Sequence, residues 1–449
     1  MSTEAAGRAG AGAPASGVGR TLRALRHRNF RLFFIGQGVS VIGTWMQQVA
    51  MSWLVYRLTG SAFILGMVTF MANIPSFMLA PFAGVLADRF DRYRIVMTTQ
   101  TVAMVQATTL AALVLTGVIE VWHILVLAGV MGMVNGFDVP ARQSLLVRLV
   151  DGPGDLANAI ALNSSMFNGA RLVGPALAGV LVGMVGEGPV FAINAASYLA
   201  VLGALMAIDV EGGAPAAERP TVSMLKTLRE GFAYALGFLP IRSILLLLAM
   251  LSLVGMPYLT LMPVFASDVL GGGPGMLGFL MGSAGLGALT GALHLASRTT
   301  VRGLGKLIGF SSTLFGIGLI AFSFSQIAWL SMLLLLVTGF GMMVTTASMN
   351  TVLQTVVDED KRGRVMSLYT MAFMGMAPIG SLFAGWLAQR IGAPATVALG
   401  GVAVISAAGL YIRHFPAVRD EVLPIYERLG ILPEVAKGLH SATELRPKS

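Results

Sequence analysis

The sequence has no cysteine among its 449 residues and only five histidines, which are scattered along the chain. The missing cysteines exclude disulfide bonds, thiolate metal sites and a cysteine nucleophile, and no group of histidines has the spacing of a metal site. Residues 303–307 (GLGKL) lack the full spacing, and the Ser or Thr, of a phosphate-binding loop. We therefore expect no enzyme activity, no metal and no cofactor.

Charged residues are also scarce, at 11% of the chain, whereas 55% of the residues are hydrophobic and the mean hydropathy is +0.78. These values lie outside the range of soluble globular domains and predict a membrane protein with many spans. The net charge of +9 would suit a nucleic acid only if the basic residues formed a soluble face. They lie mostly in short loops between apolar segments, so we expect the lipid bilayer, and no nucleic acid, as a partner.

Long apolar runs dominate what is present. A window of about 20 apolar residues per span predicts an all-α integral membrane protein with twelve transmembrane helices in two six-helix bundles. The first bundle (30–208) has its helices near residues 30–56, 61–87, 95–117, 121–148, 158–185 and 188–208. The second bundle (240–413) has its helices near residues 240–266, 274–297, 306–325, 328–356, 365–389 and 394–413.

Three stretches lie outside these bundles. Residues 1–29 are predicted to be a disordered N-terminal tail, because they begin with a run rich in Ala, Gly and Ser that has no apolar core. Residues 209–239 form a linker, in which apolar residues recur at helical spacing from Leu225 to Leu236 and predict an amphipathic helix on the membrane surface. Residues 414–449 read as a polar tail without a further span.

Lys and Arg are concentrated in the loops at one end of the predicted helices. Four such clusters lie at residues 20–31, 89–94, 298–306 and 361–364. The loops at the other end offer only Arg57 and Arg390. Because basic loops remain on the cytoplasmic side, we expect both termini to be cytoplasmic.

The two halves resemble each other in sequence. ALAG at 176–179 can be laid over LFAG at 382–385, a shift of 385 − 179 = 206, and the same shift pairs Gly174 with Gly380 without a gap. Parallel repeats are typical of a two-half transporter whose substrate site lies between the halves near the midplane. Chance matching among apolar segments is the other explanation, and the ungapped spacing favours the repeat.

One carboxylate, Asp138, lies inside a predicted span, roughly ten residues or about 15 Å from the cytoplasmic end of its helix. Arg142 follows one turn later and could pair with it, and Arg171 in the next helix lies at a similar depth. A charged residue inside the membrane is a candidate functional residue by default. The sequence leaves two interpretations open: a proton-coupling or substrate site, or a buried structural ion pair.

Uncharged polar residues interrupt three otherwise apolar helices. They are Gln37, Thr44 and Gln48 in the first helix, Asn135 in the fourth and Asn168 in the fifth. Such side chains must face protein or a water-filled cavity. They therefore either line a substrate cavity or form hydrogen bonds between helices.

A compact charged turn follows the second predicted helix. Residues 84–94 (GVLADRFDRYR) resemble the loop between helices 2 and 3 of the major facilitator superfamily, whose pattern is G-x-x-x-D-R-x-x-R-[RK]. The matching residues are Gly84, Asp88, Arg89 and Arg92, whereas Tyr93 replaces the last basic residue, which Arg94 supplies one position later.

A second motif lies in the fifth predicted helix. Residues 168–179 (NGARLVGPALAG) resemble the antiporter motif of drug exporters in this superfamily at Gly174, Pro175 and Gly179, with alanine in place of two other glycines. Proline removes a helix hydrogen bond and small residues allow close packing. This segment is therefore suited to kinking and to sealing against a neighbouring helix, although ordinary packing of small residues is an alternative.

With RHRNFRLFFIGQ (26–37) and FDVPARQ (137–143), these motifs are similar to the transmembrane secretion effector branch of the superfamily, which includes the enterobactin exporter and macrolide-efflux-like proteins of bacteria. The resemblance implies the major facilitator fold in a bacterial inner membrane. It also implies a proton-driven exporter of small amphipathic molecules such as drugs, siderophores or secondary metabolites. We expect it to act as a monomer.

The resemblance further implies a gating latch at the cytoplasmic side. Asp88 would meet the start of helix 11 at residues 363–367, and Arg92 would meet Asp151, so that the halves are locked in the outward-open state. A static surface salt bridge is the alternative. For the protein as a whole, the alternatives are an importer or lipid flippase on the same fold, or a membrane receptor that transports nothing.

Overall fold

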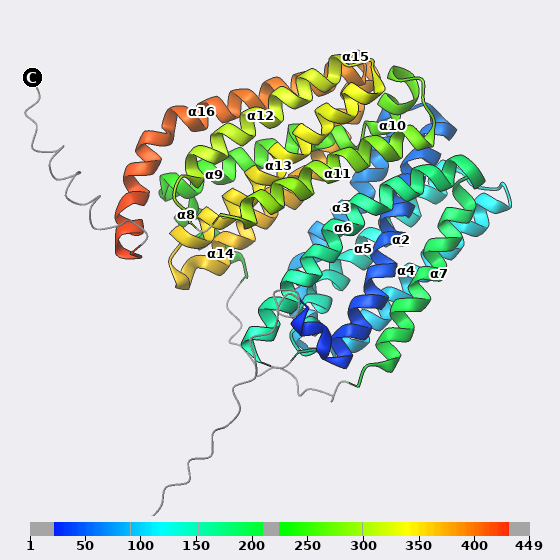
Figure 1. Cartoon of the computed structure of the whole chain (residues 1–449), viewed down its shortest axis with the longest axis horizontal. Helices are drawn as coiled ribbons and strands as arrows, with labels where there is room; N and C mark the ends of the chain where they lie inside the picture. The colour runs from blue at the N-terminus through cyan, green and yellow to red at the C-terminus, as the bar shows by residue number, and fades with distance from the viewer. Residues whose placement is uncertain (1–21, 90, 151, 210–223, 299, 431–449) are drawn as a thin grey trace, which may run out of the picture.

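The computed structural model describes residues 22–430 except 90, 151, 210–223 and 299, and it describes the side chains of these residues except 80–89, 153 and 224–229. Within this part of the chain every regular element is a helix. The helices form two bundles, which are consecutive in the sequence (Figure 1). The predicted all-α membrane fold is confirmed.

The N-terminal bundle opens with a short 3-10 helix, η1 (Arg23–Arg26), so the end of the predicted disordered tail is in fact helical. Six long helices follow: α2 (Arg28–Thr59), α3 (Ala62–Arg89), α4 (Arg92–Leu115), α5 (Val121–Leu146), α6 (Pro153–Val185) and α7 (Glu187–Ala207). Each matches a predicted span to within a few residues.

The C-terminal bundle contains two interrupted helices and four continuous ones. Its first span is divided into α9 (Leu239–Met250), η2 (Leu251–Gly255), η3 (Met256–Leu259), α10 (Met262–Val264) and η4 (Phe265–Val269). The continuous helices are α11 (Pro274–Ala296), α12 (Leu304–Phe324), α13 (Ala328–Val356) and α16 (Ala393–Arg428), and the other interrupted span is α14 (Glu359–Thr370), η5 (Met371–Gly375) and α15 (Met376–Ile391). Because Pro257 and Pro263 lack a backbone N–H, regular hydrogen bonding is lost where η3 and α10 begin.

In the described residues, eleven helical segments are long and apolar enough to cross a membrane. α2 is not among them, because polar residues interrupt it. Gln37, Ser40 and Gln47 of α2 are nevertheless buried inside the bundle. Polar side chains are tolerated at membrane depth when they face protein. We therefore count α2 as a span too, which brings the total in the described residues to the twelve that the sequence predicts.

The last helix is longer than predicted. α16 continues to Arg428, beyond residue 413, where the final span was expected to end. Pro416 and Pro424 lie inside this extension, and a proline can be accommodated in a helix at the cost of one hydrogen bond. The first part of the predicted polar tail is therefore helical.

α8 (Met224–Gly237) occupies the position of the predicted amphipathic linker helix. Phe232 and Leu236 are exposed apolar side chains on one of its faces, whereas Ala235 is buried. Glu230 of α8 pairs with Arg364 of α14 at 3.0 Å. The helix is therefore fixed to the C-terminal bundle. Residues 210–223 of the predicted linker lie outside the described residues.

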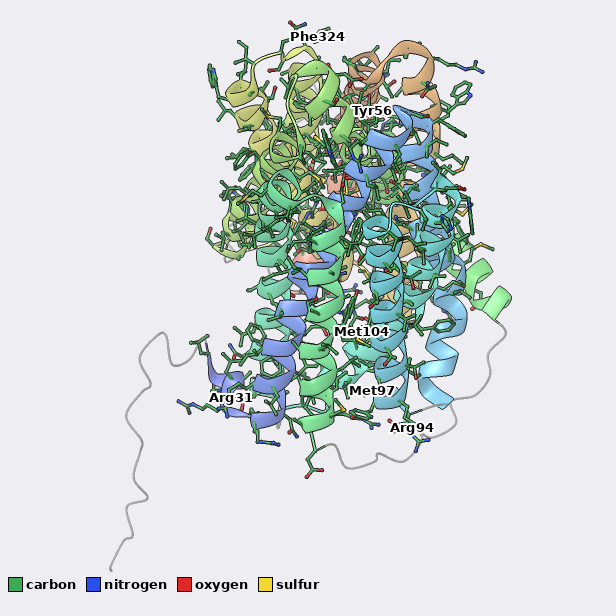
Figure 2. All side chains as sticks on the ribbon, turned by 90° about the vertical axis from the view of Figure 1, so that its right-hand side faces the viewer. Arg31, Tyr56, Arg94, Met97, Met104 and Phe324 are labelled. Carbon is green, nitrogen blue, oxygen red and sulfur yellow. The ribbon has the colours of Figure 1, made fainter. Side chains whose placement is uncertain are left out.

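The two ends of the molecule differ in charge. Figure 2 shows Arg31 and Arg94 at one end of the molecule and Tyr56 and Phe324 at the other. We call the first the basic end, because the four clusters of Lys and Arg in the sequence belong to loops at this end, and the second the far end. Successive spans run in opposite directions between these two ends, as the sequence predicts.

The two bundles meet toward the far end and separate toward the basic end (Figure 1). Two seams of glycine join them. A Cβ on Gly278 of α11 would lie 2.7 Å from the Cα of Gly179 in α6, and a Cβ on Gly385 of α15 would lie 3.1 Å from the Cα of Gly66 in α3. Such close contact between backbones requires glycine.

The glycines of these seams support the internal repeat. Gly179 and Gly385 are 206 residues apart, and each packs against a helix of the opposite bundle. Gly174 and Gly380 have the same separation, and each packs within its own bundle, against the first helix of that bundle. A Cβ on Gly174 would meet Trp45 of α2 at 2.5 Å. Equivalent positions in the two halves therefore make equivalent contacts.

Candidate functional site

Asp138 lies in α5, about two turns from the basic end of that helix, and only 3% of its surface is exposed. Its Oδ1 accepts hydrogen bonds from the Thr99 hydroxyl at 2.9 Å and from the side-chain amide of Gln100 at 2.8 Å. Its Oδ2 lies 3.5 Å from a guanidinium nitrogen of Arg142. A buried carboxylate is costly unless it is paired and hydrogen-bonded, and these three donors meet that need.

Thr99 gives this network a property that the sequence does not reveal. Its hydroxyl oxygen lies 2.9 Å from the carbonyl oxygen of Val96 and 2.9 Å from Asp138 Oδ1. One hydroxyl carries one proton, so it can donate to only one of these acceptors at a time. When Asp138 is protonated, Thr99 can donate to Val96 and accept from the carboxyl group. The network can therefore hold Asp138 in either protonation state.

Arg142 is held on two sides. It pairs with Asp138, and its guanidinium carbon lies 4.9 Å from the centre of the Phe167 ring in α6. The charge is thus shared between a carboxylate and an aromatic face. Of the two partners that the sequence offered for Asp138, the structure selects Arg142.

Arg171 lies near the middle of α6 and is not paired with Asp138. Its guanidinium carbon lies 5.9 Å from the ring centre of Trp45 in α2. Its backbone belongs to the seam with α11, because a Cβ on Gly285 would lie 3.1 Å from the Arg171 carbonyl oxygen. The two predicted functional arginines therefore lie in different surroundings.

The other predicted cavity residues are not joined into one site. Gln37 is buried and its Oε1 has no hydrogen-bond partner among the described residues, whereas Gln48 is exposed. Thr44 donates to the Ser40 carbonyl oxygen at 2.9 Å within its own helix. Asn135 and Asn168 are partly exposed. The assignment of these five side chains to a substrate cavity stays a prediction.

A buried amide network was not predicted. Gln47 donates to Gln106 Oε1 at 3.0 Å and accepts from the Asn194 amide at 2.8 Å, so α2, α4 and α7 are linked. The sequence places Gln48 on the polar stripe of the first helix, but Gln47 is the buried neighbour. Asn194 and Ser197 are polar residues three positions apart in an otherwise apolar helix, so they share a helix face. This spacing was the feature of the sequence that could have indicated the network.

The predicted latch is only partly described. Asp151 lies outside the described residues, and the side chains of Gly84, Asp88 and Arg89 do as well. Arg92 is the first residue of α4. The latch therefore stays a prediction.

The motif in the fifth span forms the predicted close packing. Pro175 lies inside α6 without ending the helix, and its carbonyl oxygen lies 2.6 Å from the position of a Cβ on Gly278. Gly174 faces α2 and Gly179 faces α11. The motif therefore packs against one helix of its own bundle and one of the opposite bundle.

Polar side chains also bridge the bundles at the far end. The Tyr56 hydroxyl of α2 donates to Asp268 Oδ2 of η4, and the Ser61 hydroxyl lies 3.1 Å from Gln389 Oε1 of α15. Arg57, the neighbour of Tyr56, is paired with Glu187 at 2.8 Å inside the N-terminal bundle. The far end is therefore held closed by two hydrogen bonds in addition to the glycine seams.

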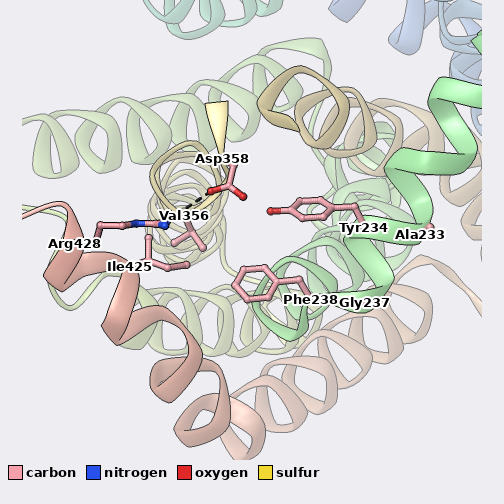
Figure 3. A pocket seen from close by; sticks show the side chains of 8 residues that line it. All are labelled: Ala233, Tyr234, Gly237, Phe238, Val356, Asp358, Ile425 and Arg428. Atoms are coloured by element: carbon pink, nitrogen blue, oxygen red, sulfur yellow. Dashed lines mark ion pairs between the residues drawn. The ribbon is translucent and has the colours of Figure 1, made fainter. Parts of the chain in front are cut away.

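A pocket of about 370 Å³ lies at the basic end of the C-terminal bundle, between α8, α13 and α16 (Figure 3). The Tyr234 hydroxyl points toward Asp358, which pairs with Arg428 at 3.7 Å. Burial, together with the charges of Asp358 and Asp360, raises the pKa of Tyr234. Neither Asp138 nor Arg171 lines this pocket, so it is separate from these charged residues inside the spans.

Known proteins share both sequence and fold with this chain. It is 25% identical to the staphyloferrin A transporter of Staphylococcus aureus over 376 residues, which cover 84% of this chain and 93% of that protein. It is 25% identical to macrolide efflux protein A of Streptococcus pyogenes over 396 residues, covering 85% and 95% of the two chains.

The fold matches that of a bacterial homologue of the human lysosomal transporter Spinster, solved in an inward-facing and unoccupied conformation. The TM-score is 0.68 at 14% identity, and the match covers 92% of this chain and 99% of the other. The sequence model of the transmembrane secretion effectors matches residues 20–425. The chain therefore belongs to the transmembrane secretion effector family, a branch of the major facilitator superfamily of membrane transporters.

Proposed function

We propose that the protein is a secondary active exporter that uses the proton gradient to move small amphipathic molecules out of the cell by alternating access. Membership of the transmembrane secretion effector family supports the transport activity. Relatives named for macrolide efflux and multidrug efflux support export. The proposal includes a functional monomer, because one chain supplies both of the bundles that alternating access requires.

The orientation of the basic end supports a particular state. If the basic end faces the cytoplasm, as the distribution of Lys and Arg favours, both termini are cytoplasmic and the bundles separate toward the cytoplasm. The structure then represents the inward-open state. The proposed latch at Asp88 and Arg92 would close this side in the outward-open state.

The observation that carries the proton drive is the environment of Asp138. This carboxylate is buried, and its three donors include a hydroxyl that can also act as an acceptor. Gln100 can serve both states as well, because its side-chain amide has an Oε1 with no partner among the described residues and could accept after rotation. A carboxylate that can be satisfied with or without its proton is what a proton-coupled cycle requires.

The test is proton-coupled transport by the purified full-length protein in sealed proteoliposomes. A proton gradient is imposed, a macrolide or staphyloferrin A is supplied, and internal pH and substrate are recorded together. We expect the wild-type protein to move substrate and protons in opposite directions. Asp138→Asn, which keeps the size of the side chain but cannot lose a proton, should retain binding and lose the coupling.

Asp420→Asn is the matched control, because Asp420 is an exposed residue of the α16 extension that contacts only its neighbour Arg419 in the described structure. It should leave coupling unchanged. Full coupling in Asp138→Asn would show that the acid is structural. Uptake of substrate into the compartment that faces the basic end would identify an importer instead.

A further inference from the structure

We propose that Arg171 of α6, Tyr258 of η3 and Trp45 of α2 form a binding site for the anionic group of an organic substrate, at the junction of the two bundles. The inference rests on the proposed transport function and adds to it a class of substrate: amphipathic organic anions that carry a carboxylate or a similar oxyanion beside an apolar or aromatic body.

Arg171 is a charged side chain that has no counter-ion among the described residues. It makes neither an ion pair nor a hydrogen bond there, and its guanidinium carbon lies 5.9 Å from the ring centre of Trp45. Two other arginines of the same bundle do have counter-ions, since Arg142 is paired with Asp138 and Arg57 with Glu187. A cation at membrane depth is expensive unless an anion compensates it. Arg171 therefore lacks a counter-ion of the kind that these two arginines have.

Tyr258 supplies a second unsatisfied group from the opposite bundle. Only 2% of its surface is exposed, and its hydroxyl has no hydrogen-bond partner among the described residues. The hydroxyl lies close enough to Arg171 for the two groups to interact electrostatically. Buried hydroxyl groups are almost always hydrogen-bonded. Arg171 and Tyr258 thus come from opposite bundles, interact electrostatically, and both lack a hydrogen-bond partner among the described residues.

The chemistry of these groups selects an anion. A guanidinium is a planar set of five N–H donors without an acceptor, and a carboxylate fits it with two parallel hydrogen bonds. The Tyr258 hydroxyl can donate to a remaining oxygen. Trp45 offers an aromatic face to the body of the substrate. A cationic drug would find no carboxylate paired with Arg171 among the described residues and would be repelled by the arginine.

The position of the site also suits a transporter. Arg171 and Trp45 belong to the N-terminal bundle and Tyr258 to the C-terminal bundle, so their separation changes when the bundles rock. A ligand that contacts both will bind the two states with different affinity, and a difference of this kind is what couples binding to a conformational change.

The experiment compares two probes of matched shape on the purified full-length protein by titration calorimetry: 2-naphthoate, and the cation 2-naphthylmethylammonium. We expect saturable binding of 2-naphthoate and at least tenfold weaker binding of the cation. Arg171→Gln should weaken 2-naphthoate binding on the order of 10- to 100-fold, as expected for the loss of a two-point charged contact. Tyr258→Phe should weaken it several-fold.

Arg171→Lys keeps the charge and should bind more tightly than Arg171→Gln, which separates a direct contact from a fault in folding. Arg419→Gln, an exposed arginine of α16, is the matched control and should leave binding unchanged. Equal affinity for the two probes, no binding of 2-naphthoate, or unchanged binding in Arg171→Gln would each overturn the site.

The experiments distinguish a failure of the anion site from a failure of the proposed exporter function. Proton-coupled efflux of a macrolide without any Arg171-dependent binding of 2-naphthoate would remove the anion site and leave the exporter. If 2-naphthoate binding depends on Arg171 but the protein moves no substrate when a proton gradient is imposed, the anion site would stand and the exporter function would not.

Discussion

At the scale of single residues, Thr99 determines how Asp138 can exchange a proton. We expect Thr99→Val, which is nearly the same size but has no hydroxyl, to remove one of the donors to the carboxylate, and this donor can also act as an acceptor without the rotation that Gln100 would need. A hydrogen bond to a charged group contributes about 1.5–3 kcal/mol, so coupled transport should fall on the order of tenfold. The measurement is the rate of substrate-dependent proton movement in proteoliposomes.

Thr101→Val is the matched control for this prediction. Thr101 lies in the same helix, and its hydroxyl donates only to the carbonyl oxygen of Met97, at 2.8 Å. It should leave coupling intact. Thr99→Ser, which retains the hydroxyl, should keep most of the activity. Equal loss in the Thr99→Val and Thr101→Val proteins would mean that the hydroxyl of Thr99 has no special role.

The sequence predicted the charged half of this site and missed the neutral half. Asp138 and Arg142 are four residues apart in one helix, so local geometry was enough to pair them. Thr99 and Gln100 come from another helix, and their meeting with Asp138 depends on how α4 and α5 pack. Whether Arg142 or Arg171 is the partner of Asp138 also depends on how each helix is rotated about its axis. The periodicity of apolar residues does not reveal this rotation in a helix that is apolar on most sides.

At the scale of elements, the contact between α6 and α11 depends on the absence of a side chain at Gly278. A Cβ there would lie 2.6 Å from the carbonyl oxygen of Pro175, which is closer than atoms of this kind approach. We expect Gly278→Ala to destabilise the closed far end by about 1–3 kcal/mol, the usual cost of overpacking, and to slow transport. Initial rates in proteoliposomes measure the effect.

Gly275→Ala provides the comparison within the same helix. Its Cβ would lie 3.9 Å from the carbonyl oxygen of Gly179, an ordinary contact, so transport should be close to the wild-type rate. If both alanine variants were equally active, the tight seam would not limit the movement of the bundles.

Helix positions followed from the sequence far better than helix interruptions did. The length of apolar runs is enough to locate a span, because the membrane sets a minimum length. The broken first helix of the C-terminal bundle depends on where Pro257 and Pro263 fall relative to their neighbours. The continuation of α16 to Arg428 depends on packing at the basic end, where Val418 and Val422 are buried, and such packing leaves little trace in a polar segment.

At the scale of the whole molecule, the hydrogen bond between Tyr56 and Asp268 connects the two bundles at the far end. Tyr56→Phe removes the donor and leaves the ring in place. Asp268→Asn removes the charge. Because Asp268 is exposed, we expect each change to cost about 1 kcal/mol and to shift the equilibrium several-fold toward a state that is open at the far end.

This shift can be measured as a distance. The chain has no cysteine, so Leu58→Cys in α2 and Ile391→Cys in α15, both exposed, can carry two spin labels at the far end without a background signal. The population with the longer distance should increase in Tyr56→Phe and Asp268→Asn. Glu187→Gln breaks a neighbouring ion pair that lies inside one bundle and should leave the distribution unchanged. An unchanged distribution in all three would show that the bond does not hold this end closed.

The equivalence of Gly179 and Gly385 has an evolutionary consequence. Each glycine sits at the same place in its half, and each presses against a helix of the other half. An ancestor of half this length, carrying one such glycine, would have formed both contacts by associating with a second copy of itself. Fusion of two copies into one gene would then have freed the halves to diverge, so that Asp138 and Arg171 could arise in one half while both halves kept the contacts that join them.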